Sequence, residues 1–172
     1  MGPNLSLLSP PTELQPTAAP PTKMQARRPR LLLVDDNKVN LKLLHSFINK
    51  RGYGPDIVDT AEDGLQAVNI FQDKAKDGLA PDVVFMDISM PVMDGYEATR
   101  TIRQHEESGR QAVASRGGAS TISRLKRTMI VALTGNSSEN SQSEALESGM
   151  DVFMTKPMRM KEVGKLLDEW RE

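Results

Sequence analysis

The sequence contains no cysteine, few aromatic residues and no long apolar run. The absence of cysteine excludes disulfides, thiolate metal sites and cysteine nucleophiles. No stretch approaches the roughly 20 apolar residues of a membrane-spanning helix, and the N-terminus lacks a charged start followed by an apolar segment. The formal net charge of -1 gives no general attraction to nucleic acid or anionic lipid. We therefore expect a cytoplasmic protein with neither a nucleic-acid partner nor a membrane contact.

The chain divides into two parts by composition. With 172 residues, of which 38% are hydrophobic and 26% charged, it has the size and make-up of one soluble domain. Residues 1–29 differ from the rest because they hold seven of the eleven prolines among Ser, Thr, Ala and Gln. Such a segment lacks the apolar periodicity of a packed element. We interpret residues 1–29 as a disordered Pro-rich linker or tail and residues 30–172 as the folded domain.

Apolar runs and helical patterns alternate along this domain. Leu31–Val34 is typical of a buried parallel strand, and Asn40–Lys50 shows apolar residues at helical spacing. In the next helical pattern, Leu65, Val68 and Phe71 are expected to face the core. The further strands are expected at 56–60, 82–86, 129–133 and 152–154, and the further helices at 64–76, 96–107, 141–147 and 161–170. Five alternating strands and helices predict a parallel α/β sheet with its chemistry beyond the carboxyl ends of the strands.

One segment interrupts this alternation before the fourth predicted strand. Residues 108–128 contain five basic residues, no acidic residue and the pair Gly117-Gly118. We predict a long inserted basic loop. A solvated insertion is the simpler reading, and a partner-binding element is the alternative.

Acidic residues follow two of the predicted strands. Asp35 and Asp36 end the first strand and Asp87 ends the third, so the carboxylates are expected to meet at one edge of the sheet. A single acid there commonly caps the next helix. Three neighbouring acids repel, so protonation or a cation must neutralise them, and oxygen ligands suit Mg2+ or Mn2+.

Two other strand ends carry complementary groups. The fourth predicted strand runs into Thr134, which offers a hydroxyl, and the fifth runs into Lys156, which offers an ammonium group. Taken singly, these residues are typical of a turn and of a solvated surface. Together with the acids they indicate a site for phosphoryl transfer.

The same strand ends form motifs that resemble the receiver domains of two-component response regulators. The motifs are Val34–Asn37, Asp87–Gly95, Ala132–Gly135 and Thr155–Pro157. The resemblance spans about residues 30–172 and is specific because the motifs occur in the family's order, each at a strand end. It implies a flavodoxin-like, doubly wound, five-stranded parallel sheet of order 2-1-3-4-5 with five helices. It also implies a phosphohistidine donor, either a histidine-containing phosphotransfer protein or a histidine kinase domain.

The resemblance implies a role for each residue of the acidic site. Asp87 would be the phosphoacceptor, and Lys156 would contact both Asp87 and the phosphoryl group. Asp36, Asp87 and the backbone carbonyl of Ser89 would bind Mg2+ directly. Asp35 would act mainly through a bound water.

The resemblance also implies a conformational switch. Thr134 would move to hydrogen-bond a phosphoryl oxygen, and Phe153 would turn inward with it. Phe153 stands where many family members have tyrosine, so it lacks a hydroxyl for the active state. The Lys156–Pro157 peptide bond is expected to be cis.

The type of receiver is a separate question. Asp36-Asn37, Asn40-Leu41 and Met90–Gly95 resemble C-terminal receivers of hybrid histidine kinases, especially eukaryotic ones of fungal type. The chain shows no Gly-rich ATP-binding box of a kinase, so its expected catalysis is limited to its own phosphorylation and dephosphorylation. A stand-alone response regulator and a phosphorylation-independent interaction module stay open as alternatives.

Two enzyme classes with related folds do not fit. An aspartyl-phosphate phosphatase needs an acid two residues after its nucleophile, where Ser89 stands. A dinucleotide-binding domain needs a Gly-rich turn where residues 35–37 stand.

Overall fold

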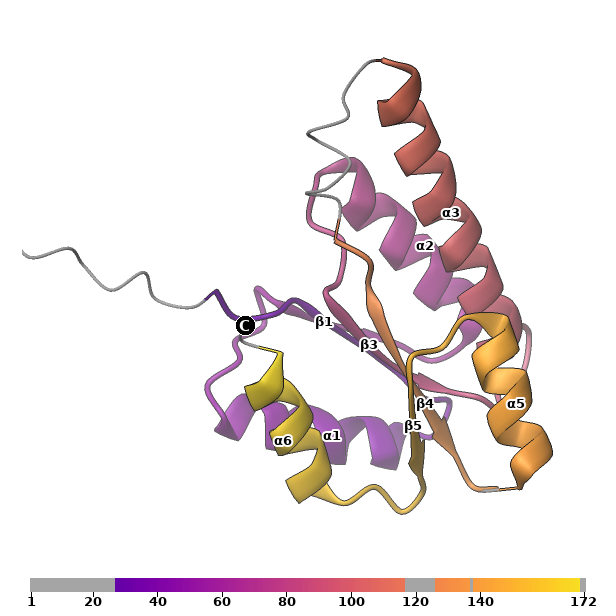
Figure 1. Ribbon diagram of the computed structural model, residues 1–172. Helices are drawn as coiled ribbons and strands as arrows, with labels where there is room; N and C mark the ends of the chain where they lie inside the picture. The colour runs from indigo at the N-terminus through magenta and orange to yellow at the C-terminus, as the bar shows by residue number, and fades with distance from the viewer. Residues whose placement is uncertain (1–26, 117–125, 137, 171–172) are drawn as a thin grey trace, which may run out of the picture.

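The computed structural model describes residues 27–116, 126–136 and 138–170 (Figure 1). Most of the predicted Pro-rich segment and the centre of the predicted basic loop lie outside these residues. Among the described helices, none combines the length and the apolar character needed to cross a membrane.

Five parallel strands form one sheet in the order β2-β1-β3-β4-β5, which confirms the predicted order. The strands are β1 (Leu31–Val34), β2 (Val58–Ala61), β3 (Val83–Asp87), β4 (Met129–Thr134) and β5 (Val152–Thr155). The central strands β1 and β3 are buried along their whole length, as continuous apolar sequences require when helices cover both faces. Their register sets Met86 of β3 beside Val34 of β1 and Ala132 of β4. The residues that follow β1 and β3 therefore emerge side by side.

Helices cover both faces of the sheet. The described helices are α1 (Lys38–Lys50), α2 (Gly64–Lys76), α3 (Gly95–Ser115), α5 (Glu139–Ser148) and α6 (Met160–Glu169). Leu44 of α1 and Val163 of α6 share one buried apolar cluster. Phe71 of α2, Ile102 of α3 and Ala145 of α5 belong to the other. Figure 1 shows the same division, with α1 and α6 on one side and α2, α3 and α5 on the other, so the sheet is doubly wound as predicted.

Polar residues begin four of the helices immediately after strand ends or loops. The backbone N–H groups in the first turn of a helix have no acceptor within the helix. The side-chain oxygens of these residues accept hydrogen bonds from them. The capping residues are Asn37, Asp63, Asp94 and Ser138. Two of these caps, Asn37 and Asp94, terminate the loops that follow β1 and β3, and so fix the backbone around the acidic residues.

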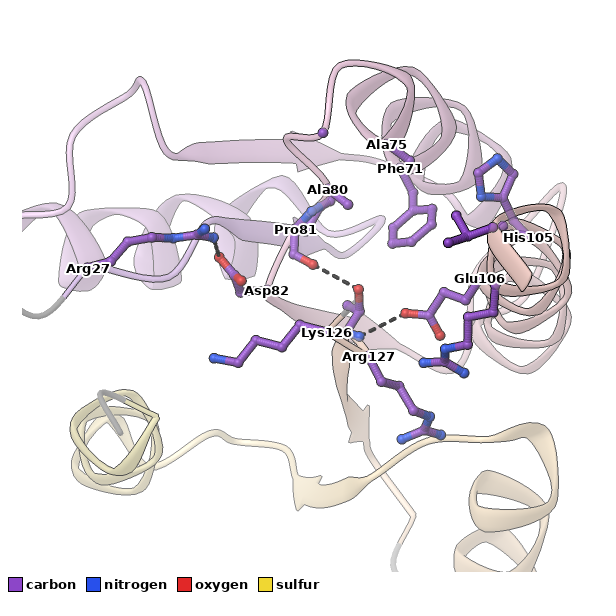
Figure 2. Close-up of a pocket in the computed structure, with 15 residues that line it drawn as sticks. Arg27, Phe71, Ala75, Ala80, Pro81, Asp82, His105, Glu106, Lys126 and Arg127 are labelled. Carbon is purple, nitrogen blue, oxygen red and sulfur yellow. Dashed lines mark hydrogen bonds and ion pairs between the residues drawn. The ribbon is translucent and has the colours of Figure 1, made fainter. Parts of the chain in front are cut away.

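Helix α3 is longer than the sequence predicted. The expected loop over residues 108–128 is wrong for residues 108–115, because α3 continues to Ser115. Polar contacts along the helix support these turns: Gln111 Nε2 donates to Glu107 Oε1, and Ser115 Oγ donates to the carbonyl of Gln111. The extension lines a pocket with α2 at the amino-terminal end of β3 and β4 (Figure 2).

One predicted core residue lies elsewhere. Leu65 is 44% exposed, whereas Ala67, Val68 and Phe71 form the buried face of α2. Leu65 lies in the first turn of α2, on the exposed side of the helix. The smaller Ala67 faces the sheet instead of Leu65.

Candidate functional site

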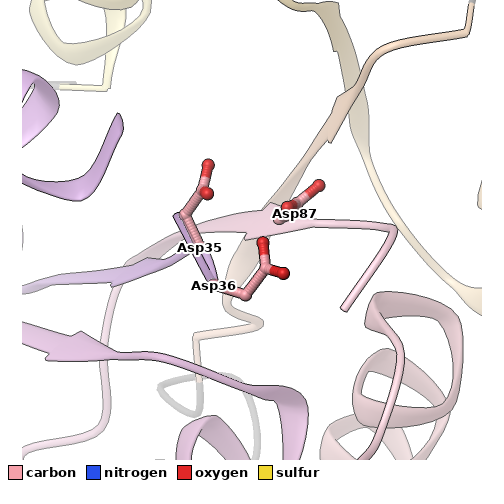
Figure 3. Close-up of side chains that lie close together, drawn as sticks. All are labelled: Asp35, Asp36 and Asp87. Carbon is pink, nitrogen blue, oxygen red and sulfur yellow. The ribbon is translucent and has the colours of Figure 1, made fainter. Parts of the chain in front are cut away.

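Three carboxylates converge at the carboxyl ends of β1 and β3 (Figure 3). One oxygen each from Asp35, Asp36 and Asp87 lies within 4.8 Å of the others. Asp35 and Asp87 are 3% and 4% exposed, whereas Asp36 is exposed. The predicted meeting of the three acids is confirmed, and it follows from the parallel pairing of β1 with β3.

The ammonium group of Lys156 joins two of these carboxylates. Its Nζ lies 2.7 Å from Asp35 Oδ2 and 2.9 Å from Asp87 Oδ2. Lys156 follows β5 directly, and its backbone N–H donates to the carbonyl of Thr134 at the end of β4. The Lys156–Pro157 peptide bond is cis, as predicted. The contact with Asp35 was not predicted, because spacing along the chain does not show which acid a residue from another strand will meet.

Burial and neighbouring charges shift the pKa of both Asp87 and Lys156. Burial raises the pKa of Asp87 above that of an ordinary aspartate, Lys156 opposes the rise, and the nearby charge of Asp35 adds to it. Burial on its own would lower the pKa of Lys156, but hydrogen bonds and charge attraction from Asp35 and Asp87 raise it overall. Lys156 is therefore a cation at neutral pH. One ammonium against three acidic groups leaves the site short of positive charge.

Asp35 is held by the turn that leads into α1. The backbone N–H of Asn37 donates to Asp35 Oδ1 at 2.9 Å. The side-chain amide of Asn40 lies 3.3 Å from each Asp35 oxygen. The contact between Asn40 and Asp35 was not predicted. The position of Asn40 could have indicated it, because the first turn of the helix after an acidic strand end faces back toward that strand.

The loop after β3 approaches Asp87 closely. The backbone N–H of Ser89 donates to Asp87 Oδ1 at 3.3 Å, and the N–H of Gly95 donates to the carbonyl of Ile88 at 3.0 Å. A Cβ atom at Gly95 would overlap the backbone oxygen of Asp87. Glycine is therefore needed where α3 begins against the end of β3.

The side chains of Thr134 and Phe153 make their contacts with other residues than the four of the acidic site. Thr134 is buried, and its hydroxyl donates to the carbonyl of Asn136 while accepting from the N–H of Asn136. Phe153 on β5 is half-buried and packs against the cluster formed with α2, α3 and α5. The structure thus brings together Asp35, Asp36, Asp87 and Lys156. It leaves the movements of Thr134 and Phe153 as predictions.

The donor set fits a hard divalent cation. Asp36 is exposed and, among the described residues, makes no ion pair, while Asp87 has a second oxygen beyond the one that meets Lys156. Carboxylate and carbonyl oxygens at an open edge are the ligands that Mg2+ combines with water and phosphate.

The sequence of this domain matches a known family over most of its length. A family model described as the response regulator receiver domain matches residues 31–168. This chain belongs to that family. Histidine kinase 5 of Arabidopsis thaliana is 30% identical over 155 residues, which cover 85% of this chain and 16% of that protein. The receiver spans between 7% and 16% of the length of the curated relatives compared, most of which are named as histidine kinases.

Solved receiver structures share the fold. The receiver domain of Ssk1 from Saccharomyces cerevisiae, crystallised with the histidine phosphotransfer protein Ypd1, is 31% identical with a TM-score of 0.65, covering 83% of this chain and 88% of that chain. The receiver domain of the histidine kinase CKI1 from Arabidopsis thaliana, complexed with Mg2+, is 29% identical with a TM-score of 0.64, covering 84% and 94%.

Proposed function

We propose that this receiver domain takes a phosphoryl group from a phosphohistidine onto Asp87 as one step of a phosphorelay. The observation that carries the proposal is the position of the Asp87 carboxylate. It ends β3, contacts Lys156 at 2.9 Å and lies within 4.8 Å of Asp35 and Asp36. Buried acids with a cationic partner and a perturbed pKa are typical of catalytic sites.

The transfer follows from the groups around Asp87. A carboxylate oxygen of Asp87 attacks phosphorus in line with the P–N bond of the donor. The P–O bond forms as the P–N bond breaks, and the electron pair leaves with the imidazole. An ionised carboxylate needs no general base. Ser89 N–H holds one oxygen of Asp87, and the Lys156 ammonium balances negative charge on the phosphoryl oxygens.

The proposed site also includes a bound divalent cation. Mg2+, or Mn2+ in its place, would be held by Asp36, Asp87 and the backbone carbonyl of Ser89, with Asp35 acting through water. When bound, the cation would offset negative charge on the transferring phosphoryl group. The shortage of positive charge among the three acids supports this assignment, as does the Mg2+ complex of the CKI1 receiver.

Phosphorylation is further proposed to shift the domain between two conformations. Thr134 would exchange its hydrogen bonds with Asn136 for one with a phosphoryl oxygen, and Phe153 would turn inward. The half-buried position of Phe153 beside a small cavity of about 120 Å3 lined by Ala145 and Met150 leaves room for that turn.

The names of the similar curated proteins favour a hybrid histidine kinase as the context. These names, and the phosphotransfer partner of the Ssk1 receiver, support a histidine-containing phosphotransfer protein or a kinase domain as donor. The cytoplasm, expected from the sequence, is the proposed compartment. A stand-alone regulator and an interaction module that works without phosphorylation are the alternatives.

Phosphoryl transfer from a phosphorylated histidine-containing protein tests the proposal. Wild type is expected to be labelled with Mg2+ and not with EDTA, and Asp87→Asn is expected to lose labelling. Asp73→Asn is the matched control, because Asp73 is an exposed aspartate on α2. Equal labelling of Asp87→Asn and wild type would contradict the assignment. Absence of labelling in wild type would favour the interaction module.

A further inference from the structure

A second site lies at the opposite end of the sheet from the carboxylates. A pocket of about 410 Å3 is bounded by α2, α3 and the segments before β3 and β4 (Figure 2). It is lined by Asp82 and Thr128, which immediately precede these strands, whereas Asp87 and Thr134 end them. The pocket is thus separated from the phosphoacceptor site by the length of both strands. Its volume is within the range of pockets that hold small molecules.

One wall of this pocket is apolar and includes two aromatic rings, of which Phe71 is 2% exposed and His105 is half-buried. Phe71 and Ala75 come from α2, and Ala80 and Val113 add aliphatic surface. The rings of Phe71 and His105 lie 5.9 Å apart between centroids and nearly perpendicular, at 88°. An aromatic ligand could make the same kind of contact with the remaining exposed surface of His105.

The acidic groups of the pocket are already neutralised inside the protein. Asp82 receives Arg27 Nη2 at 2.6 Å. Glu106 receives Arg103 Nη1 at 2.7 Å and the backbone N–H of Thr128 at 2.8 Å. Neither carboxylate is left to bind a cationic ligand.

Two basic groups of the lining are not neutralised in this way. The nearest carboxylate contact of Arg110 among the described residues is Glu107, at 3.9 Å. Lys126 makes no ion pair within the described part of the chain, and its ammonium lies 4.0 Å from the centre of the Trp170 ring. Because the ammonium of Lys126 is directed at Trp170, Arg110 is the group that an anion in the pocket would meet without a close carboxylate among the described residues.

We propose that this pocket binds a small aromatic anion, with its ring against His105 and the aliphatic surface of Ala80 and Val113 and its charged group beside Arg110. The extension of α3 makes the site, because Gly109, Arg110 and Val113 all lie beyond the point where the sequence predicted the helix to end. The site is independent of phosphoryl transfer to Asp87.

The probe for the test is 8-anilinonaphthalene-1-sulfonate, titrated into the native domain by fluorescence and by amide NMR. Shifted amides are expected at Ala80 and Asp82 and in residues 105–113 and 126–128, and not at residues 87–89. Arg110→Ala is expected to weaken binding about three- to fivefold, the usual effect of a partly exposed charge pair. Arg100→Ala, an exposed arginine on the same helix outside the pocket, is expected to bind as wild type does.

A second variant tests the pocket itself. Gly109 lines it, and a Cβ atom there would meet nothing within 4 Å, so Gly109→Leu can begin a side chain at the pocket without a backbone clash, and leucine favours the helix. It is expected to reduce probe affinity at an unchanged or higher melting temperature. Uncharged N-phenyl-1-naphthylamine is expected to bind more weakly than the sulfonate. Shifts confined to other residues, or affinity unchanged in both Arg110→Ala and Gly109→Leu, would overturn the proposal.

Discussion

Asp87 shares the ammonium group of Lys156 with Asp35, so the protonation of Asp87 depends on both neighbours. Burial raises the pKa of Asp87, and Lys156 holds the rise in check. In a carbon-13 NMR titration without metal, the Asp87 carboxyl is therefore expected to titrate above the range of exposed aspartates. In Lys156→Met its pKa is expected to rise further. A pKa within or below the range of exposed aspartates would contradict this account.

The same pKa shift links Asp87 to stability. Because the folded-state pKa of Asp87 lies above its unfolded value, the carboxyl favours folding when protonated, and that contribution is lost as pH rises through the folded pKa. Asparagine never ionises. Metal-free Asp87→Asn is thus expected to unfold at a higher temperature than wild type at neutral pH, and the difference is expected to shrink on acidification. A difference that grows on acidification would show the opposite sign of linkage.

Mg2+ provides a companion measurement on the same residue. A ligand that binds only the folded state raises the melting temperature. Mg2+ is expected to stabilise wild type and to have a smaller effect on Asp87→Asn, which keeps the neighbouring Asp36 but loses one charged ligand. Equal stabilisation of the two proteins would remove Asp87 from the proposed metal site.

At the scale of elements, the start of α3 is fitted against the end of β3 at Gly95. A methyl group there would overlap the backbone oxygen of Asp87, so either the helix or the strand end must shift. Gly95→Ala is expected to lower the free energy of unfolding by about 1 to 3 kcal/mol, the usual cost of overpacking, and to slow phosphoryl transfer. Gly109→Ala, on the same helix with free space around it, is the control and is expected to be neutral or stabilising. A fully stable Gly95→Ala would contradict the close approach.

The central strands could be predicted because buried parallel strands have continuous apolar sequences, whereas β2, with the sequence Val-Asp-Thr-Ala, starts two residues later than the predicted range 56–60. Leu31–Val34 and Val83–Asp87 show this pattern, and the acids that follow them are placed by the topology alone. The length of α3 could not be predicted, because its last turns depend on polar contacts within the helix and bury little. The contacts of Lys156 with Asp35, and of Thr134 with Asn136, depend on side-chain positions that no spacing in the chain specifies.

The whole molecule has two distinct ends. At the carboxyl end of β3 and β4 lie the acidic cluster and Thr134, and at the amino end lies the pocket beneath the extended α3. Membership of the receiver family accounts for the first end. The second depends on the extension of α3, whose last turns lie beyond the helix predicted for residues 96–107.

The central claim is that the phosphoryl group resides on Asp87, and borohydride reduction followed by peptide mass spectrometry tests it most directly. An aspartyl phosphate is reduced to homoserine, whereas a free aspartate is not. After transfer with Mg2+, homoserine is expected at position 87 and not at positions 35 or 36. Homoserine at Asp35 or Asp36, or a labelled protein with none at position 87, would contradict the claim.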